Sequence, residues 1–311
     1  MSKLLSPRVL LPVLIILAAA VALSIWMPRV VLPAIEIPAE PVLHLFGFSI
    51  TNTLLASWLT MLVLIVLAVL GTRQMSEVPS GLQNLWEMVI ETFYNLVENI
   101  AGPKWGKRFF PIVMTIFLFL ILSNWMGILP FFGSVGWLEP AHEGVGYEIQ
   151  SLGEGIALLT RHEAGEGHGY KLAPFLRSAA TDLNVPLALA LVSVFLTQFF
   201  GVRSLGVRYF KKFFAFDFRH GVFNGVVQMI VGLLELVSEF AKIISFTFRL
   251  FGNIFAGEVL LGVLAFLIPV IVSVPFYGLE LFIGFIQALV FSMLTLVFFT
   301  LATAGHGEGA H

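Results

Sequence analysis

Cysteine is absent from the chain, and charged residues are scarce. The 311 residues include no Cys, and Asp, Glu, Lys and Arg together make up 12%. The missing thiols exclude disulfides, thiolate catalysis and cysteine-ligated metal sites. The net charge of −2, with no basic cluster interleaved with aromatic residues, argues against a nucleic-acid partner. What the chain has instead is 58% hydrophobic residues and a mean hydropathy of +0.95, which predicts a polytopic integral membrane protein.

An apolar run near the N-terminus is open to two interpretations. Residues 9–27 follow Lys3 and Arg8 and are long enough to form a first membrane span. The small residues at Ala20–Ala22 equally suit the cleavage site of a signal peptide. Both alternatives place residues 28–50 outside. We therefore expect residues 1–45 to form a hydrophobic segment with an external linker, and residues 46–311 to form the membrane domain.

Hydropathy and helix-breaking residues predict an all-α integral membrane protein with five to six membrane helices. An amphipathic surface helix is expected over residues 82–100, ending at Gly102 and Pro103. Residues 221–266 contain no proline, so as one helix they would extend roughly 65 Å, about twice the hydrocarbon thickness of ~30 Å. Such a helix must be strongly tilted or broken. The other expected spans are residues 50–71, 109–132, 183–203 and 276–303.

Residues 134–180 form an external insertion rich in Glu and Gly. The insertion contains His142, His162 and His168, a set that invites a metal-site interpretation. Because no pair of these histidines has ligand spacing on a predicted helix, we expect a solvated loop and no metal. The sequence assigns the insertion no function.

The distribution of Lys and Arg predicts the orientation in the membrane. The basic residues near the expected spans, including the group between Arg203 and Arg219, fall on one side, and the acidic insertion falls on the other. The positive-inside rule makes the basic side cytoplasmic. The C-terminus is then also cytoplasmic, provided that residues 221–266 cross the membrane once.

Arg249 is the residue that most needs an explanation. It lies inside an apolar helix, where an unpaired arginine costs from ~3 to ~15 kcal/mol, depending on how the cost is measured. Glu258 falls about 180° from Arg249 and roughly 14 Å further along, so the two cannot share one compact site. Two separate aqueous approaches, one from each side of the membrane, fit this pattern. At about 100° per residue, one narrow polar stripe runs along the helix through Glu235, Ser238, Lys242, Ser245, Arg249 and Asn253.

Several residues on or near the stripe also have simple structural explanations. Lys242 is expected to extend to the cytoplasmic interface, and Glu239, about 80° from the stripe, is expected to be interfacial. Ser245 is more typical of a packing serine. Asp182 suits a helix N-cap better than a functional role. Arg249 has no such explanation, because no carboxylate lies three or four residues from it on its own helix.

Four classes of membrane protein could place Arg and Glu within the bilayer. A cytochrome needs paired histidines inside helices, and every histidine here lies in a loop, an end or the tail. An intramembrane hydrolase needs a nucleophile with a base, and the spans contain no Ser–His or Asp–Asp arrangement. A secondary ion or solute transporter with an intramembrane Arg/Glu site remains as an alternative, although we find no internal repeat. A stator that conducts ions past a separate moving carrier best suits an arginine with too few partners in its own chain.

The polar stripe belongs to a set of motifs that resembles a known family. Ser238, Lys242 and Ser245 precede the run Arg-Leu-Phe-Gly-Asn at Arg249–Asn253, and Ala-Gly-Glu follows at Ala256–Glu258. From about residue 45 to 303, in order, the chain resembles subunit a of the F-type ATP synthase. The other motifs of the resemblance are Pro79–Asn84 with Glu87, Asn124–Pro130, Asp182–Val185, and Gln287 in the last helix.

The resemblance implies a role for each polar residue of the two long C-terminal helices. These helices would lie tilted against a rotor ring of c subunits, which favours a single helix over residues 221–266. Arg249 would face a carboxylate on the ring and separate two half-channels, with Gln287 helping to orient it. The other implied residues of the ion path are Glu258 and Glu280 on the outer side, Asn253 and Gln287 near the ring contact, and Glu235 and Ser238 on the cytoplasmic side, with Ser245, Lys242 and Asp182 as further candidates.

The resemblance also implies partners and a compartment. The partners would be the c-ring, the peripheral-stalk b subunits and the remainder of the F1Fo complex, in the plasma (inner) membrane of a bacterium. The chain would carry protons or sodium ions, hold no cofactor or metal, and catalyse no reaction by itself. It departs from some relatives at Glu280, where they carry histidine.

Overall fold

Five long helices form the membrane part of the structure. The computed structural model describes Ala22 and residues 38–304, without residues 46, 74, 79–80, 130, 141–146, 154–155, 162–169, 214–221 and 268–272. Within this part of the chain, five helices are long and apolar enough to cross a membrane, which confirms the predicted all-α membrane fold. The sixth candidate span, residues 9–27, lies outside the described residues apart from Ala22. The five are α2 (Asn52–Thr72), α3 (Leu82–Gly127), α4 (Asn184–Leu205), α5 (Val222–Leu267) and α6 (Ser273–Thr303).

The predicted surface helix and the span after it are joined as α3, with a sharp bend between them. The bend is at Gly102, where φ is 72° and ψ is 168°, a backbone conformation that favours glycine. Pro103 follows, because its fixed φ suits the first position of the next helical segment. The predicted end of the surface helix at this point is confirmed. Before the bend, Phe93 and Val97 are buried against the bundle, whereas Leu82 remains exposed.

The core lies between α3, α4 and α6. The rings of Phe109, Phe200 and Phe299, one from each helix, pack with centroids 5.0, 5.3 and 5.1 Å apart. The hydroxyls of Ser193 on α4 and Thr295 on α6 lie 2.8 Å apart and are fully buried. Lipid tails are as apolar as these side chains, so helices in a bilayer associate through close packing and such polar contacts.

Two side chains of α3 also donate hydrogen bonds to the backbone of α6. The Asn124 Nδ2 group donates to the Gly284 carbonyl oxygen over 3.1 Å, and the Trp125 Nε1 group donates to the Leu281 carbonyl oxygen over 3.0 Å. Gly284 leaves the space for this approach, because a Cβ there would lie 3.0 Å from the Asn124 Cβ. These bonds fix the height and the rotation of α6 against α3.

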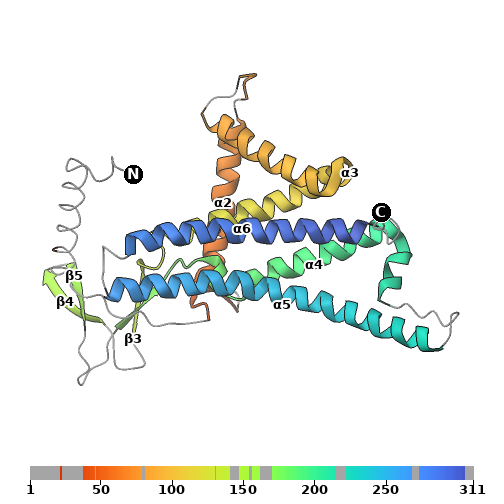
Figure 1. Cartoon of the computed structure of the whole chain (residues 1–311). Coiled ribbons are helices and arrows are strands. Elements are labelled where there is room, and N and C mark those ends of the chain that lie inside the picture. Colours follow the sequence, from red (N-terminus) through yellow and green to blue (C-terminus); the bar gives the residue numbers. More distant parts are fainter. Residues whose placement is uncertain are drawn as a thin grey trace, which may run out of the picture.

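Helices α5 and α6 run side by side along the length of the molecule (Figure 1). α5 is one unbroken helix of 46 residues, so the prediction of a single helix over residues 221–266 is confirmed, and its tilt stays a prediction. A narrow row, Phe246, Leu250 and Ile254, is buried against the bundle. Much of the remaining α5 surface is apolar and exposed. α6 begins at Ser273, slightly before the predicted start at residue 276.

The chain outside the long helices contains strands that the sequence analysis missed. Residues 41–51 form an antiparallel hairpin of β1 (Pro41–Leu45) and β2 (Phe48–Thr51). The loop predicted over 134–180 contains regular structure, because a four-stranded antiparallel sheet of order β3-β6-β4-β5 lies there. Its outer pairing joins Gly136 to Pro174, a long-range contact that local composition does not reveal. His142, His162 and His168 lie outside the described residues. The four strands are β3 (Gly136–Pro140), β4 (Tyr147–Gly153), β5 (Ile156–Arg161) and β6 (Tyr170–Pro174).

Candidate functional site

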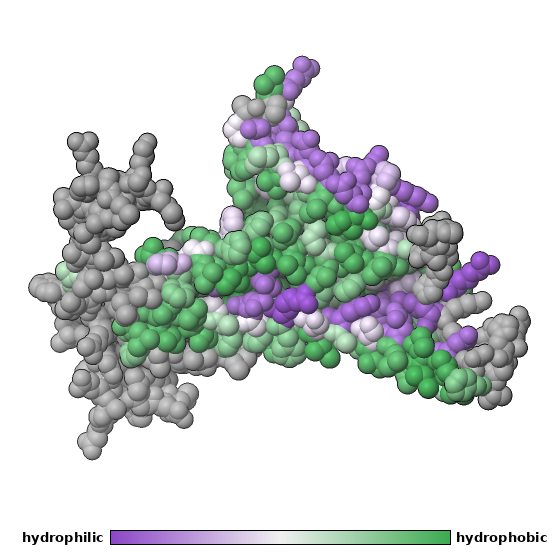
Figure 2. All heavy atoms as spheres, in the orientation of Figure 1, coloured by the Kyte–Doolittle hydropathy of each residue, from purple (hydrophilic) through white to green (hydrophobic). Residues whose placement is uncertain are grey.

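Arg249 lies exposed on α5, midway between the two ends of the helix. Within the described residues, no carboxylate lies within ion-pair distance of its guanidinium, whose carbon is 6.0 Å from the centre of the Phe246 ring. Figure 2 shows hydrophilic side chains in a row along the α5–α6 pair, with hydrophobic surface above and below them. An arginine within a membrane-spanning helix is costly unless it has a partner or a path to water.

The polar stripe of α5 is partly exposed and partly covered. Near Arg249, the Asn253 Nδ2 group donates a 2.9 Å hydrogen bond to the Arg249 carbonyl oxygen. Gln287, on the neighbouring α6, is half-buried. The exposed members of the stripe are Ser238, Ser245, Arg249 and Asn253, and the half-buried members are Glu235 and Lys242.

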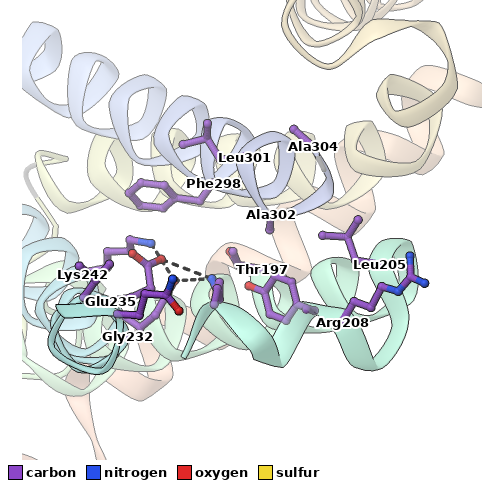
Figure 3. A pocket seen from close by; sticks show the side chains of 15 residues that line it. Thr197, Leu205, Arg208, Gly232, Glu235, Lys242, Phe298, Leu301, Ala302 and Ala304 are labelled. Atoms are coloured by element: carbon purple, nitrogen blue, oxygen red, sulfur yellow. Dashed lines mark hydrogen bonds and ion pairs between the residues drawn. The ribbon is translucent and has the colours of Figure 1, made fainter. Parts of the chain in front are cut away.

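A large cavity opens beside the N-terminal half of α5. This Lys212 cavity has a volume of about 850 Å³ and is lined by α4, α5, α6 and the 3₁₀ helix η2 (Gly206–Lys212). It brings together the predicted residues Glu235 and Lys242, but Ser238 is not among its lining residues. Figure 3 shows the ion pairs of the cavity, with the Arg208 guanidinium pointing away from them.

Glu239 is the centre of the charges in the Lys212 cavity. Its carboxylate is 3.1 Å from the Lys212 ammonium and 3.0 Å from the Lys242 ammonium, and only 7% of the residue is exposed. The interfacial positions predicted for Glu239 and Lys242 stay predictions, but both side chains are committed to one ion-pair cluster. Helical angles alone could not reveal this, because η2 folds back over α5 and supplies Lys212.

Lys212 remains charged at neutral pH. Burial lowers the pKa of Lys212, but the Tyr209 hydroxyl and the Glu239 carboxylate raise it by more, so its pKa lies above the ordinary value. The ammonium also lies 4.4 Å from the centre of the Tyr209 ring and 3.5 Å from a Glu235 oxygen. The ion pairs of Lys212 thus hold η2 against α5.

Replacing Glu239 with glutamine should destabilise the protein by about 3 kcal/mol, because two half-buried ammonium groups lose their shared carboxylate. The measurement is the thermal unfolding temperature of the detergent-purified protein. Lys212→Arg keeps the charge and serves as the control, which should stay near the parent temperature. Equal unfolding temperatures for the parent and Glu239→Gln would show that the cluster does not hold η2 in place.

A second, smaller cavity lies beside the C-terminal half of α5. This Glu280 cavity has a volume of about 330 Å³, and its lining includes Glu258 of α5 and Glu280 of α6. Asn124 of α3 and Arg177, from the segment before α4, also face it. The two carboxylates that the family resemblance assigns to one approach therefore line one cavity.

Glu280 is held in a nearly closed space. Only 7% of it is exposed, and no hydrogen bond or ion pair to it is found within the described part of the chain. Gly257 of α5 makes this space, because a Cβ at that position would occupy the volume of the Glu280 carboxylate. A buried carboxyl group without a fixed partner is suited to accept and release a proton.

We expect Gly257→Ala to lower proton conduction about tenfold, since the added methyl group displaces the Glu280 carboxyl group. Gly278→Ala is the matched control, because a Cβ there meets nothing within 4 Å. The measurement is dye-reported proton flux across membrane vesicles. Equal flux in the two variants would mean that the Glu280 position is not critical.

Glu258 has a partner that the sequence analysis missed. The Nε group of Arg177 donates to both carboxylate oxygens of Glu258, over 3.0 and 3.2 Å. The two residues are 81 positions apart in the chain, so no helical spacing signals the contact.

Asp182 lines neither cavity. It is 5% exposed and accepts hydrogen bonds from the Asn184 backbone N–H over 3.3 Å and from the Thr53 hydroxyl over 3.2 Å. These bonds tie the start of α2 to the start of α4. The predicted N-cap role of Asp182 is wrong by one position, because the N-cap residue of α4 is Leu183.

The chain is similar in sequence to known proteins over most of its length. The profile of the ATP synthase A chain family matches residues 54–300, which include both cavities' glutamates on α5 and α6. The chain belongs to the ATP synthase A chain family. It is 32% identical to ATP synthase subunit a of Gloeobacter violaceus over 257 residues, which cover 83% of this chain and 85% of the relative.

Membership of the ATP synthase A chain family confirms the family predicted from the sequence motifs. It makes the chain a membrane-embedded, multi-pass and non-catalytic subunit, as expected. The relative is bacterial.

Proposed function

We propose that this chain is the ion-translocating stator of an ATP synthase, with two offset half-channels on either side of Arg249. One observation carries the proposal: an exposed arginine without an in-chain counter-charge in the described structure lies between two cavities along one helix. On α5, Arg249 is about 10 Å beyond Lys242 of the Lys212 cavity and about 8 Å before Ile254 of the Glu280 cavity.

In this proposal, Arg249 receives its counter-charge from a carboxylate on a ring of c subunits. A fixed guanidinium attracts the ionised carboxylate and disfavours a proton at that point. A proton therefore cannot pass directly from one cavity to the other, and must travel on the ring. Each 100 mV of membrane potential supplies ~2.3 kcal/mol per charge moved, which the ring converts to rotation.

The Glu280 cavity serves as the outer half-channel. Glu258 lies at its more open side, with a side chain 42% exposed, and Glu280 is buried deeper. Protons would pass from Glu258 to Glu280 and then to the ring carboxylate near Asn253 and Gln287. Sodium ions, if they are the transported species, would follow the same carboxylates.

The Lys212 cavity serves as the cytoplasmic half-channel. Glu235 is its most exposed carboxylate and would receive the outgoing proton, whereas Glu239 is committed to Lys212 and Lys242. Ser238 and Ser245 are exposed on the face that carries Arg249 and would contact the ring. Arg203, Arg208 and Lys212 mark this end as cytoplasmic by the positive-inside rule, which also places the C-terminus there, in the plasma membrane.

Purification through a tag on this chain tests the proposal. In mild detergent, the chain should bring with it a ring of small, two-helix proteolipids that carry one acidic residue each, together with peripheral-stalk b subunits and the F1 sector. The apolar, uncovered face of α5 supports this partner. A chain that purifies alone and takes up a solute in vesicles would instead support the secondary-transporter alternative.

A further inference from the structure

The external insertion is held firmly where it joins the bundle. Its two ends pair through the Gly133 N–H, which donates to the Leu176 carbonyl oxygen over 3.0 Å, and the Phe175 N–H, which donates to the Val135 carbonyl oxygen over 2.9 Å. β3 and β6 continue this pairing. The side chain of Asn52, at the start of α2, donates to the Pro174 carbonyl oxygen over 3.3 Å. The residues that follow Pro174 are therefore fixed against the membrane helices.

Arg177 comes directly after these paired ends of the insertion, here called the stem, and reaches across to α5. It is 9% exposed, and its Nε group bonds both oxygens of Glu258. The guanidinium carbon lies 6.0 Å from the centre of the Phe255 ring, which stacks on the Phe251 ring with centroids 5.2 Å apart. Arg177 is thus held by the stem on one side and by one turn of α5 on the other.

The two carboxylates of the Glu280 cavity consequently have different surroundings. Glu258 is on the more open side and is fixed by Arg177. Glu280 is buried, and within the described residues no partner binds it. Without Arg177, the Glu258 side chain would be free to turn away from the cavity, because little else covers it.

We propose that Arg177 is a positioning residue of the ion path, and that the external insertion serves to hold it against Glu258 at the mouth of the Glu280 cavity. The inference rests on the proposed function, in which this cavity is the outer half-channel. Arg177 acts through Glu258 and does not itself carry the ion. The insertion, to which the sequence assigns no function, thereby shapes the entrance.

Passive proton conduction in vesicles stripped of F1 tests this inference on the assembled membrane sector. Arg177→Ala and Glu258→Gln should each lower conduction, by about tenfold for Arg177→Ala. The double variant should conduct at least as well as whichever single variant has the lower conduction. A residue that acts through Glu258 has no further effect once Glu258 is disabled. Arg177→Lys keeps a positive charge within reach and should recover most of the conduction. Co-purification of the c-ring checks assembly in every variant.

The outcomes separate this inference from the proposed function. Equal losses from Arg177→Ala in the parent and in the Glu258→Gln background would show a purely structural role and overturn the inference. Full conduction in Arg177→Ala with impaired Glu258→Gln would also overturn it, and would leave the proposed function standing. Full conduction in Glu258→Gln would remove Glu258 from the path and overturn the inference, and would leave the proposed role of Arg249 standing. If Arg177→Ala does not assemble, the same comparison is made with Arg177→Gln, which should lose conduction where Arg177→Lys retains it.

Discussion

Replacing Arg249 with alanine should abolish ATP synthesis and ATP-driven proton pumping, while the complex still assembles. The guanidinium is exposed and forms no ion pair within the described residues, so its removal leaves no buried group unpaired. The substitution removes the positive charge that keeps a proton from passing directly between the two cavities. The proton then no longer has to travel on the ring. The measurement is the rate of vesicle acidification on addition of ATP.

The control for this experiment is Arg73→Ala. Arg73 is also exposed, but it lies just after α2, away from both cavities. That variant should acidify vesicles at the parent rate. Acidification at the parent rate in Arg249→Ala would refute the central role of the arginine, whatever the control shows.

The second large effect is expected from Glu280→Gln, which should reduce proton conduction about a hundredfold. A carboxamide has nearly the same shape as the carboxyl group but cannot accept and release a proton at neutral pH. Positioned proton-transfer groups contribute about 10²–10⁴-fold to rates. Passive conduction in vesicles stripped of F1 measures the loss directly.

Glu280→His provides the matched comparison. Imidazole is again a group that exchanges protons near neutral pH, so this variant should conduct far better than Glu280→Gln. If the two variants conduct equally poorly, proton exchange at this position is not sufficient, and the negative charge of the carboxylate is required. Unchanged conduction in Glu280→Gln would remove the residue from the ion path.

The sequence predicted the membrane helices well because their signals are local. Long apolar runs end at charged residues or at Gly102 and Pro103, and the absence of proline between 221 and 266 predicted an unbroken α5. The two carboxylates of the Glu280 cavity were predicted as well. Glu258 belongs to the motifs around Arg249, and Glu280 is the acidic residue of the last helix. Helical spacing predicts which side chains share one face of a helix. The polar stripe of α5, from Glu235 to Asn253, follows that spacing.

The contacts that the sequence did not predict all join distant parts of the chain. Arg177 meets Glu258, and Lys212 meets Glu239, because a connecting segment folds back onto α5 in each case. Such pairs follow from the path of the segment between helices, which no helical period encodes. The strands of the insertion were missed for the same reason, since β3 pairs with β6 across the whole insertion.

The bonds from Asn124 and Trp125 to the α6 backbone have a mechanical consequence. A turning ring exerts a tangential force on the helices that face it, and a stator must pass that force to its anchor without slipping. Because the two bonds end on the carbonyl oxygens of Gly284 and Leu281, they grip the main chain of α6 and do not depend on its side chains. If the chain is the stator proposed above, torque on α6 would pass into α3, and through the bend at Gly102 to the part of α3 that precedes it.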